Sequence, residues 1–344
     1  MIKSVVIENP GSYDKLLVKE GDLRSPDDDE VLIECRACGV NFADCCVRMG
    51  VYRSAKVYVG WPITPGFEVA GTIKEIGTKV SEFSVGQRVV AITRFGGYTS
   101  HLIVKANQVF LLPDEISFEE GAGFPAIFLT AGYALNELAH PRPGQNILVH
   151  SAAGGVGSAL VQLGKLAGCH VTGVVGGSHK IEAVKELGAD NVIDKSQQSL
   201  WREVERISPE GFDVILDANG PETLRQSYRH LSPGGKLVVY GFHTMLSKGR
   251  GKPNWFKVIW DYIRTPLFNP MNMTTDNHSV LAFNLSYLFE KNVLLRTELE
   301  KLIHLFKEGK LHFPSISTYP LDKVAEAHKA LESGQTVGKL VLIP

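Results

Sequence analysis

The sequence lacks both a long hydrophobic run and an excess of charge of one sign. Its 344 residues include 36 lysines and arginines and 37 aspartates and glutamates, so the formal net charge is -1. A nearly neutral surface does not attract nucleic acid or an anionic bilayer over its whole area. No apolar segment reaches the about 20 residues of a membrane helix, and the first residues begin a strand pattern without a signal-peptide core. We therefore expect a cytoplasmic globular protein that binds no nucleic acid.

Cysteine is scarce and poorly placed for disulfides. Four of the five cysteines crowd between residues 35 and 46, and Cys169 stands alone, which is not the pattern of a secreted disulfide framework. Cys35 and Cys38 have the spacing of a zinc knuckle, but they lie in a strand pattern, where an odd separation points side chains to opposite faces. No second pair completes four ligands, so we expect no metal site.

The pattern of elements changes near residue 120. Before it, short segments separated by Pro and Gly predict a compact antiparallel barrel, with strands at 3–8, 30–37, 68–76, 88–92 and 98–104. After it, helices alternate with segments that predict a parallel sheet covered on both faces, with strands at 146–150, 170–175, 191–194, 213–217 and 236–240. A further strand is expected at 282–289, and the tail, with a helix and a last strand, returns to the first style.

The segment from Gly144 to Lys165 organises this second part. A buried strand at 146–150 leads through a turn of small residues at 151–153 into a glycine run and a helix. The helix is expected to bury one stripe, formed by Val156, Leu160, Leu163 and Leu166. A strand that breaks into glycines and continues as a helix directs backbone N–H groups and the positive helix end at one point, where a diphosphate binds. We therefore predict a dinucleotide site at Gly154, Gly155, Val156 and Gly157.

Several motifs resemble one family over nearly the whole chain. In order they are CGVNFAD, MGVY, PGFEVAGTIKEIG, VGQRV, AAGGVG, LGAD, DANG and VGKLVL. They resemble landmarks of the medium-chain dehydrogenase/reductase superfamily, and the glycine-rich segment resembles its quinone oxidoreductase and zeta-crystallin branch. Residues 269–288 look most like the VAT-1-like group. The resemblance implies an α/β fold in which a Rossmann-type doubly wound domain, residues 121–290, is inserted into a β-rich GroES-like barrel domain, residues 1–120 and 291–344. It also implies a homodimer.

The zinc ligands of that superfamily are missing. Zinc alcohol dehydrogenases carry a cysteine in the place of Asn41 and a histidine in the place of Phe67, and neither amide nor phenyl binds zinc. Residues 124–126 offer no third ligand. Glu68 remains, and we expect it to be a buried charge paired with an arginine. Without a Lewis acid, the compatible chemistry is hydride addition to a substrate that is already electrophilic, a quinone or an α,β-unsaturated carbonyl.

Three residues are candidates for the catalytic site. Asn41 would donate to a substrate oxygen or to the nicotinamide ribose; the alternative is that it satisfies a turn after its strand. Tyr52 lies in a loop whose aromatic residues line the site in the quinone reductase branch. Cys46 stands where that branch often has a second tyrosine, and nearby basic residues make a reactive thiol one hypothesis. Otherwise water delivers the proton.

The residues after the second strand of the predicted sheet indicate the cofactor. An NAD site has an acidic side chain about 20 residues after the first glycine, but residues 174–180 read VVGGSHK, without an acid. Donors and positive charge suit a 2′-phosphate, so we expect NADPH, held by Gly176, Ser178 and Lys180, with Lys195 as a second charge. The alternative for Lys180 is a solvated residue at a helix start.

Further cofactor contacts are expected at the ends of other strands and helices. The resemblance implies Thr130 near the nicotinamide, although a threonine within a helix also packs. Asn219 in DANG and the pair Gly241 and Phe242 follow strands, at the edge where ligands of such sheets bind. Asn284 is expected in the last strand of the sheet.

The aromatic segment within residues 245–280 leaves three interpretations open. Trp255, Val258, Ile259 and Tyr262 share a helical stripe, which predicts a lid over the site or an oligomer interface. The same residues, with Lys257 and Arg264, also suit a helix lying on a membrane. The sequence therefore supports two hypotheses: a zinc-free NADPH-dependent quinone or enone reductase, or a VAT-1-like nucleotide-binding protein that associates with a membrane or partner and has weak redox activity.

Overall fold

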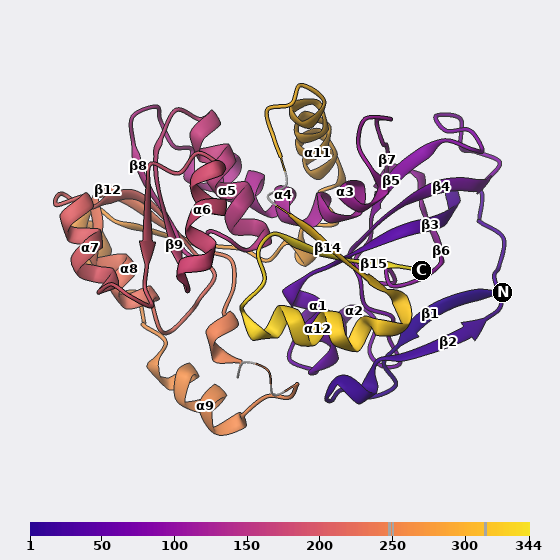
Figure 1. Cartoon of the computed structure of the whole chain (residues 1–344), viewed down its shortest axis with the longest axis horizontal. Helices are drawn as coiled ribbons and strands as arrows, with labels where there is room; N and C mark the ends of the chain where they lie inside the picture. The colour runs from indigo at the N-terminus through magenta and orange to yellow at the C-terminus, as the bar shows by residue number, and fades with distance from the viewer. Residues whose placement is uncertain (247–248, 250, 313–314) are drawn as a thin grey trace. The chain divides into compact units, whose positions relative to one another are not determined.

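The computed structural model describes residues 1–246, 249, 251–312 and 315–344. The chain forms two compact units, each with its own sheet (Figure 1). Unit 1 is built mainly from residues 1–127 and 286–344, and unit 2 mainly from residues 128–246 and 253–285. The units divide at 127/128 and 285/286, against the expected 120/121 and 290/291. Residues 247, 248 and 250 of the aromatic 245–280 segment lie outside the described residues.

A seven-stranded, mostly antiparallel sheet forms the core of unit 1. Its order is β14-β15-β3-β4-β5-β7, with β6 paired to β3. The strands are β3 Glu30–Val40, β4 Glu68–Ile76, β5 Arg88–Ile92, β6 His101–Lys105, β7 Val109–Leu111, β14 Ile316–Pro320 and β15 Lys339–Ile343. A separate hairpin pairs β1 Ile2–Val6 with β2 Leu17–Gly21. The helices that accompany these strands are α1 Phe42–Arg48, α2 Arg53–Tyr58, α3 Phe118–Gly123, α11 Asn292–Lys307 and α12 Val324–Ser333.

A β-bulge in β3 corrects the expected placement of two cysteines. The register of β3 against β4 shifts between Cys35 and Ala37, so one extra residue enters the strand there. Cys35 and Cys38 therefore both lie in the same buried cluster, while Arg36 faces solvent. Burial, and to a lesser extent the Cys38 thiol, raise the pKa of Cys35. Strict alternation, which predicted opposite faces, was wrong because the bulge resets it.

A six-stranded parallel sheet forms the core of unit 2. Its order is β10-β9-β8-β11-β12-β13, the doubly wound arrangement predicted from the sequence. The strands are β8 Asn146–Val149, β9 His170–Val175, β10 Asn191–Asp194, β11 Phe212–Asp217, β12 Leu231–Val239 and β13 Ser279–Ala282. The helices are α4 Pro125–Gly132, which begins in unit 1, α5 Gly155–Leu166, α6 Ile181–Glu186, α7 Leu200–Ile207, α8 Leu224–Arg229, α9 Trp255–Arg264 and α10 Pro270–Asp276. Figure 1 shows α5 and α6 on one side of the sheet and α7 and α8 on the other.

Two expectations about unit 2 were wrong. The apolar run 282–289 is not a strand, because β13 ends at Ala282 and a 3-10 turn, Leu285–Tyr287, follows. The buried stripe of α5 was also misjudged. Leu166 is exposed and Val156 is half-buried, while small residues such as Gly157 and Ala159 are fully covered. Small side chains let the helix lie close to the sheet, and a count of large apolar residues does not detect them.

Candidate functional site

The turn between β8 and α5 fits a diphosphate. Ser151 has a positive φ of 54°, and Gly154 precedes the helix in an extended conformation. A Cβ atom at Gly157 would lie 2.2 Å from the carbonyl oxygen of Ser151, so only glycine fits there. The first-turn N–H groups of Gly155, Val156 and Gly157 have no acceptor within an α-helix, and the helix adds positive potential at that end. The residues present therefore fit a dinucleotide.

Lysines follow both β9 and β10, two neighbouring strands of the sheet. Gly176 is exposed, and a Cβ atom on it would lie 3.8 Å from Cε of Lys195, which directly follows β10. Lys180 is only 9% exposed, so it is not a solvated lysine at a helix start. The parallel pairing of β9 with β10 places these residues at one sheet edge.

Asp194 is a carboxylate in this region that the sequence analysis missed. Its Oδ2 accepts a hydrogen bond from Ser178 Oγ at 2.6 Å, and its Oδ1 accepts from Ser196 N and Oγ at 2.9 and 2.7 Å. These hydrogen bonds lower its pKa. Asp194 ends a strand that the sequence predicts at its observed bounds, but the acid of an NAD site is expected after the second strand, and Asp194 lies at the end of the third.

The loops after β11 and β12 are joined by hydrogen bonds. Asn219 is buried and its Oδ1 accepts from Ser151 Oγ at 3.0 Å, which ties it to the turn before α5. The carbonyl oxygen of Asn219 accepts from Thr244 N and Oγ1 at 3.1 and 2.7 Å. A Cβ atom at Gly220 would lie 2.9 Å from the ring of Phe242, and one at Gly241 would lie 3.1 Å from the oxygen of Ala218. These two loops therefore hold one defined shape at the carboxyl edge.

A buried network fixes the start of the β11 loop. The carboxylate of Asp217 accepts from Thr223 Oγ1 at 2.7 Å, from Ser227 Oγ at 2.9 Å and from the backbone N–H of Asn219 at 2.8 Å. His150 Nε2 lies 3.1 Å from Ser227 Oγ. Burial lowers the pKa of His150, so the imidazole is neutral at pH 7. The network was not foreseen, because its members lie 77 residues apart in the sequence.

Two expected cofactor contacts lie elsewhere than at the glycine turn. Thr130 is half-buried within α4. Asn284 is exposed and follows β13 rather than lying in it, because that strand ends two residues earlier. Both stay predictions as cofactor contacts.

Asn41 in unit 1 belongs to a buried polar cluster. Its Nδ2 donates to Glu68 Oε1 at 2.8 Å, and its Oδ1 accepts from Lys339 Nζ at 2.5 Å. Lys339 Nζ also donates to Glu68 Oε1 at 2.7 Å, so Glu68 is paired with a lysine and not with the expected arginine. The only signal for Lys339 in the sequence is the motif VGKLVL, which predicts a strand but no partner for the lysine.

Asp44 lies beside this cluster. Its carboxylate accepts from the backbone N–H groups of Asn41 and Gly66, each at 2.8 Å, and from Tyr98 Oη at 3.0 Å. Burial raises the pKa of Asp44 to about 7, while these hydrogen bonds and the charge of Lys339 oppose the rise. A group with this pKa exchanges a proton near neutral pH.

The other two catalytic candidates, Tyr52 and Cys46, lie in different chemical environments. Tyr52 is half-buried and packs edge-on against the buried rings of Phe67 and Phe95, with its ring centroid 6.0 and 6.5 Å from theirs. Burial, with the charges of Glu332 and Asp44, raises the pKa of Cys46 to about 12. The thiol is then protonated at neutral pH, which argues against an activated thiolate.

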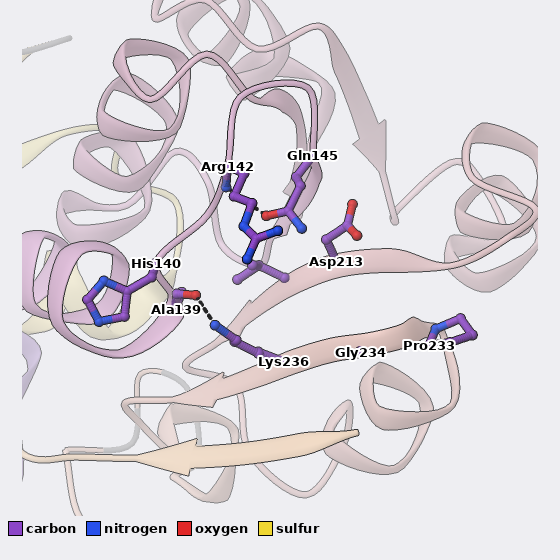
Figure 2. Close-up of a pocket in the computed structure, with 9 residues that line it drawn as sticks. Ala139, His140, Arg142, Gln145, Asp213, Pro233, Gly234 and Lys236 are labelled. Carbon is purple, nitrogen blue, oxygen red and sulfur yellow. Dashed lines mark hydrogen bonds between the residues drawn. The ribbon is translucent and has the colours of Figure 1, made fainter. Parts of the chain in front are cut away.

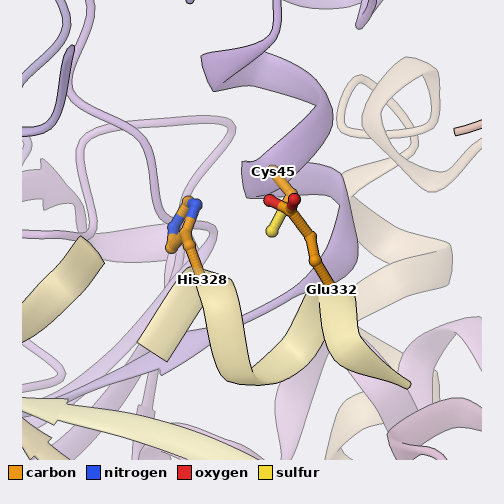
Figure 3. A group of neighbouring side chains, drawn as sticks. All are labelled: Cys45, His328 and Glu332. Atoms are coloured by element: carbon orange, nitrogen blue, oxygen red, sulfur yellow. The ribbon is translucent and has the colours of Figure 1, made fainter. Parts of the chain in front are cut away.

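A second cluster in unit 1 was not predicted. Cys45 of α1 and His328 and Glu332 of α12 bring three donor atoms within 4.8 Å of one another (Figure 3). The donors suit a soft cation, but Glu332 already forms a buried ion pair with Arg48 and accepts from Tyr13 Oη at 2.7 Å. The guanidinium supplies the positive charge that a metal would otherwise bring.

A hollow of about 370 Å³ lies in unit 2 beside Asp213, at the start of β11. Figure 2 shows Lys236 reaching the carbonyl oxygen of Ala139, with Arg142 and Gln145 on the facing loop. Because Asp213 marks the amino end of the strand, the hollow lies at the edge opposite to the glycine turn. It is not part of the candidate dinucleotide site.

Helix α9 exposes most of its apolar side chains and buries one carboxylate. Asp261 is buried and pairs with Lys257, which also donates to the carbonyl oxygen of Thr244. The exposed fractions of Trp255, Phe256, Ile259, Trp260, Tyr262 and Ile263 run from 57% to 90%. Of the predicted stripe, Val258 is half-buried, while Trp255, Ile259 and Tyr262 are not covered by the described residues; the lid, interface and membrane interpretations stay predictions. No helix in the described part of the chain has the length and apolarity to span a membrane.

The fold and the glycine turn define a two-domain oxidoreductase with a dinucleotide-binding sheet. The alcohol dehydrogenase GroES-like domain matches residues 27–114, and the zinc-binding dehydrogenase family matches residues 187–342. The chain is 34% identical to the synaptic vesicle membrane protein VAT-1 homolog of Danio rerio, over 99% of this chain and 69% of that protein. It belongs to the medium-chain dehydrogenase/reductase family.

Solved structures of quinone and enoyl reductases are similar. The quinone oxidoreductase of Escherichia coli, solved with NADPH, has a TM-score of 0.84 and 26% identity over 99% of this chain and 100% of that chain. The CurK enoyl reductase has a TM-score of 0.85 and 27% identity, covering 99% of each chain. The fold class and the family predicted from the sequence are confirmed.

Zinc, which the name of one matching family implies, does not fit the residues at Asn41. Two oxygen atoms at this position could bind a metal ion, Asn41 Oδ1 and Glu68 Oε1, and both already accept hydrogen bonds from the ammonium of Lys339. The neighbouring Phe67 offers no ligand atom. A zinc ion would have to displace a buried lysine and would find neither thiolate nor imidazole there.

Proposed function

We propose that this chain is an NADPH-dependent, zinc-independent reductase that transfers hydride to a quinone or another α,β-unsaturated carbonyl. The observation that carries the proposal is the turn from Ser151 to Gly157, with Lys180 and Lys195 at the same sheet edge. The NADPH complex of the similar E. coli quinone oxidoreductase supports it. When bound, the dinucleotide supplies the hydride, and the protein supplies binding, orientation and hydrogen bonds.

The charges beyond β9 favour NADPH over NADH. Ser178 Oγ donates to Asp194, so the hydroxyl hydrogen is already used. The positive charge for a 2′-phosphate therefore comes from Lys180 and Lys195. Asp194 accepts hydrogen bonds from Ser178 and Ser196, and these lower the pKa of its carboxyl group. Gly155, Val156 and Gly157 would hold the diphosphate through backbone N–H groups, and Gly154, whose N–H donates to the carbonyl oxygen of Ser151 at 2.9 Å, closes the turn before them.

Unit 1 supplies the groups that meet the substrate. In hydride addition to an enone or quinone, negative charge develops on the carbonyl oxygen and needs a hydrogen-bond donor. Asn41 is that donor in this proposal, with Tyr52 as an aromatic wall. Cys46, as a protonated thiol, contributes a small apolar surface. Water remains the proton donor.

The test is a panel of 1,2- and 1,4-quinones and enones assayed with NADPH and NADH side by side. NADPH should support turnover, and Asn41→Ala should lower kcat on the order of a hundredfold, as expected for one oxyanion donor. Asn107→Ala, an exposed asparagine of unit 1, is the control. Turnover of no acceptor with either cofactor would overturn the proposal.

The exposed face of α9 favours a second candidate function, association with an anionic membrane. The face combines tryptophan, tyrosine and aliphatic side chains with the exposed cation Arg264, a composition typical of interfacial helices. Flotation with phosphatidylserine vesicles should be lost in Phe256→Ser/Ile263→Ser and kept in Val293→Ser, an exposed apolar residue of α11. If the wild type and both variants all fail to float with the vesicles, this function is excluded.

We also propose a homodimer formed through the edge of the unit 2 sheet. β13 ends the strand order, and in the described residues it pairs with β12 alone. Such an edge accepts another strand. Light scattering of the purified chain tests this, and a monomeric mass at micromolar concentration contradicts it.

A further inference from the structure

Two oxygen atoms of unit 1 converge on one buried ammonium group. Lys339 Nζ lies 2.5 Å from Asn41 Oδ1 and 2.7 Å from Glu68 Oε1. The side chains of Lys339 and Glu68 are 3% and 0% exposed, so solvent does not screen the pair. The arrangement is a cation site made from an amide oxygen and a carboxylate oxygen, and a side chain of the protein fills it.

The backbone makes room for both charged side chains. A Cβ atom at Gly39 would lie 2.4 Å from Glu68 Oε1, and one at Gly123 would lie 3.1 Å from Cγ of Lys339. The second carboxylate oxygen, Glu68 Oε2, accepts from the backbone N–H of Ala126 at 2.6 Å. Both carboxylate oxygens of Glu68 are therefore fixed by hydrogen bonds, and the ammonium of Lys339 binds at Oε1.

This cluster determines which way the Asn41 amide points. Nδ2 donates to Glu68 Oε1 at 2.8 Å while Oδ1 accepts from Lys339. A flipped amide would set its NH2 group against the ammonium and its oxygen against the carboxylate, and both contacts would repel. An amide nitrogen carries two hydrogens, and the hydrogen bonds of the described residues use one of those on Asn41. Since Asn41 is half-buried, it meets any further partner as a donor.

Stability alone does not account for the cluster. Replacing a buried ion pair by apolar side chains of similar volume is often neutral or stabilising. The hydrogen-bonded pair instead holds the Asn41 amide in one orientation, and a hydrogen-bond donor in catalysis needs a fixed orientation.

We propose that Lys339 and Glu68 are positioning residues that hold the Asn41 amide as a hydrogen-bond donor, and that the ammonium of Lys339 is the resident cation of this site. The group that Asn41 meets is then an acceptor, the carbonyl oxygen of the quinone or enone. This inference rests on the proposed function, because it assigns a role to Asn41 in that reaction. It also explains the disagreement with the zinc-binding family, since the lysine already uses the oxygens that a metal would need.

The first experiment replaces Lys339 and returns the cation as a small molecule. Lys339→Ala should lower kcat about tenfold to a hundredfold, the range for a misplaced donor, and leave KM within about threefold. Added ethylammonium should restore kcat, whereas tetramethylammonium, which has no N–H group, should not. Lys329→Ala, an exposed lysine of α12, is the control and should respond to neither ion. Wild-type kcat in folded Lys339→Ala would overturn the inference.

A second variant keeps the test decisive if Lys339→Ala does not fold. Glu68→Gln/Lys339→Met removes both charges together, which avoids a single unpaired buried charge. It should fold, bind NADPH as the wild type does, and show the same loss of kcat. Full kcat in this double variant would show that the pair does not position Asn41.

Calorimetry separates this inference from the proposed function. Ethylammonium should bind to Lys339→Ala and should not bind to Lys339→Ala/Glu68→Gln, whether or not the wild type reduces any quinone or enone. If the wild type has no turnover but the amine binds in this pattern, the proposed function fails and the cation site stands. If the amine does not bind to folded Lys339→Ala, the inference is overturned even for an active enzyme.

Discussion

Asp44 and His328 share one hydroxyl group in the core of unit 1. Tyr98 Oη donates to Asp44 Oδ2 at 3.0 Å and lies 3.2 Å from His328 Nε2. Since the hydroxyl hydrogen is directed at Asp44, the tyrosine oxygen accepts from His328, which sets the proton of the imidazole on Nε2. Burial raises the pKa of Asp44 to about 7 and lowers that of His328 to about 3.

These shifts predict opposite effects of pH on stability. Between about pH 4 and 7 folded Asp44 keeps a proton that the unfolded chain releases, so its contribution to stability falls as pH rises. Below about pH 6.5 the unfolded chain protonates His328 and the folded chain does not, so this contribution falls as pH decreases. The free energy of unfolding of Asp44→Asn should therefore rise with pH more steeply than that of the wild type. For His328→Gln, the slope of the free energy of unfolding against pH should be more negative than for the wild type.

Denaturant titrations across this interval measure both slopes. One titrating group changes the slope by up to about 1.4 kcal/mol per pH unit. The absolute stability of either variant is not the test, because each substitution also removes a hydrogen bond. Curves parallel to that of the wild type would show that neither group is shifted.

Gly157→Ala should impair dinucleotide binding. The added Cβ atom would lie 2.2 Å from the carbonyl oxygen of Ser151 and force the turn apart. The dissociation constant of NADPH, measured by its fluorescence, should rise at least about tenfold, or 1.4 kcal/mol. Gly154→Ala is the matched control, because its Cβ atom would lie 3.3 Å from the same oxygen. Equal affinities of both variants for NADPH would contradict the predicted site.

Lys195→Glu should change the choice of cofactor. Reversing a charge beside Gly176 should weaken NADPH about tenfold or more and leave NADH nearly unchanged, because the 2′-phosphate alone meets that charge. Lys180→Gln should act in the same direction and avoids burying a carboxylate. Lys185→Glu, on the exposed part of α6, is the control. An equal loss of both cofactors would refute the phosphate assignment.

Breaking the Arg48–Glu332 pair should destabilise unit 1 strongly. Both side chains are buried, at 0% and 2% exposed, so Arg48→Met leaves the carboxylate without its charge partner. The loss should be about 3–5 kcal/mol in the free energy of unfolding. Arg48→Met/Glu332→Met should recover much of it, as measured by the denaturant midpoint. A double variant less stable than Arg48→Met would contradict this account.

The sequence predicts the parts of this molecule that depend on local patterns. The parallel sheet of unit 2 is predicted by apolar strands that alternate with helices. The glycine turn is predicted because its backbone leaves no room for a Cβ atom at Gly157, so the sequence must carry glycine there. The strand β4 was predicted at its observed bounds, Glu68–Ile76, because Pro and Gly separate the short strands of this part of the chain.

The sequence does not predict features that depend on distant residues or on register. Lys339 lies 271 residues from Glu68, and no local pattern indicates that the two pair. The bulge in β3 has no composition signal, so the shared face of Cys35 and Cys38 was missed. The apolar stripe of α9 was predicted, but no local pattern says whether a lid contact, a second subunit or a membrane covers it; within the helix, Asp261 is the buried residue.

The Lys339–Glu68 pair also sets an order of events during synthesis. The carboxylate leaves the ribosome long before the lysine, since all of unit 2 is translated between them. The first part of unit 1 therefore carries a negative charge that has no counterion inside it while the dinucleotide unit is complete and ready to fold. A nascent chain stalled before β15 should bind NADPH and yet leave unit 1 open to proteases.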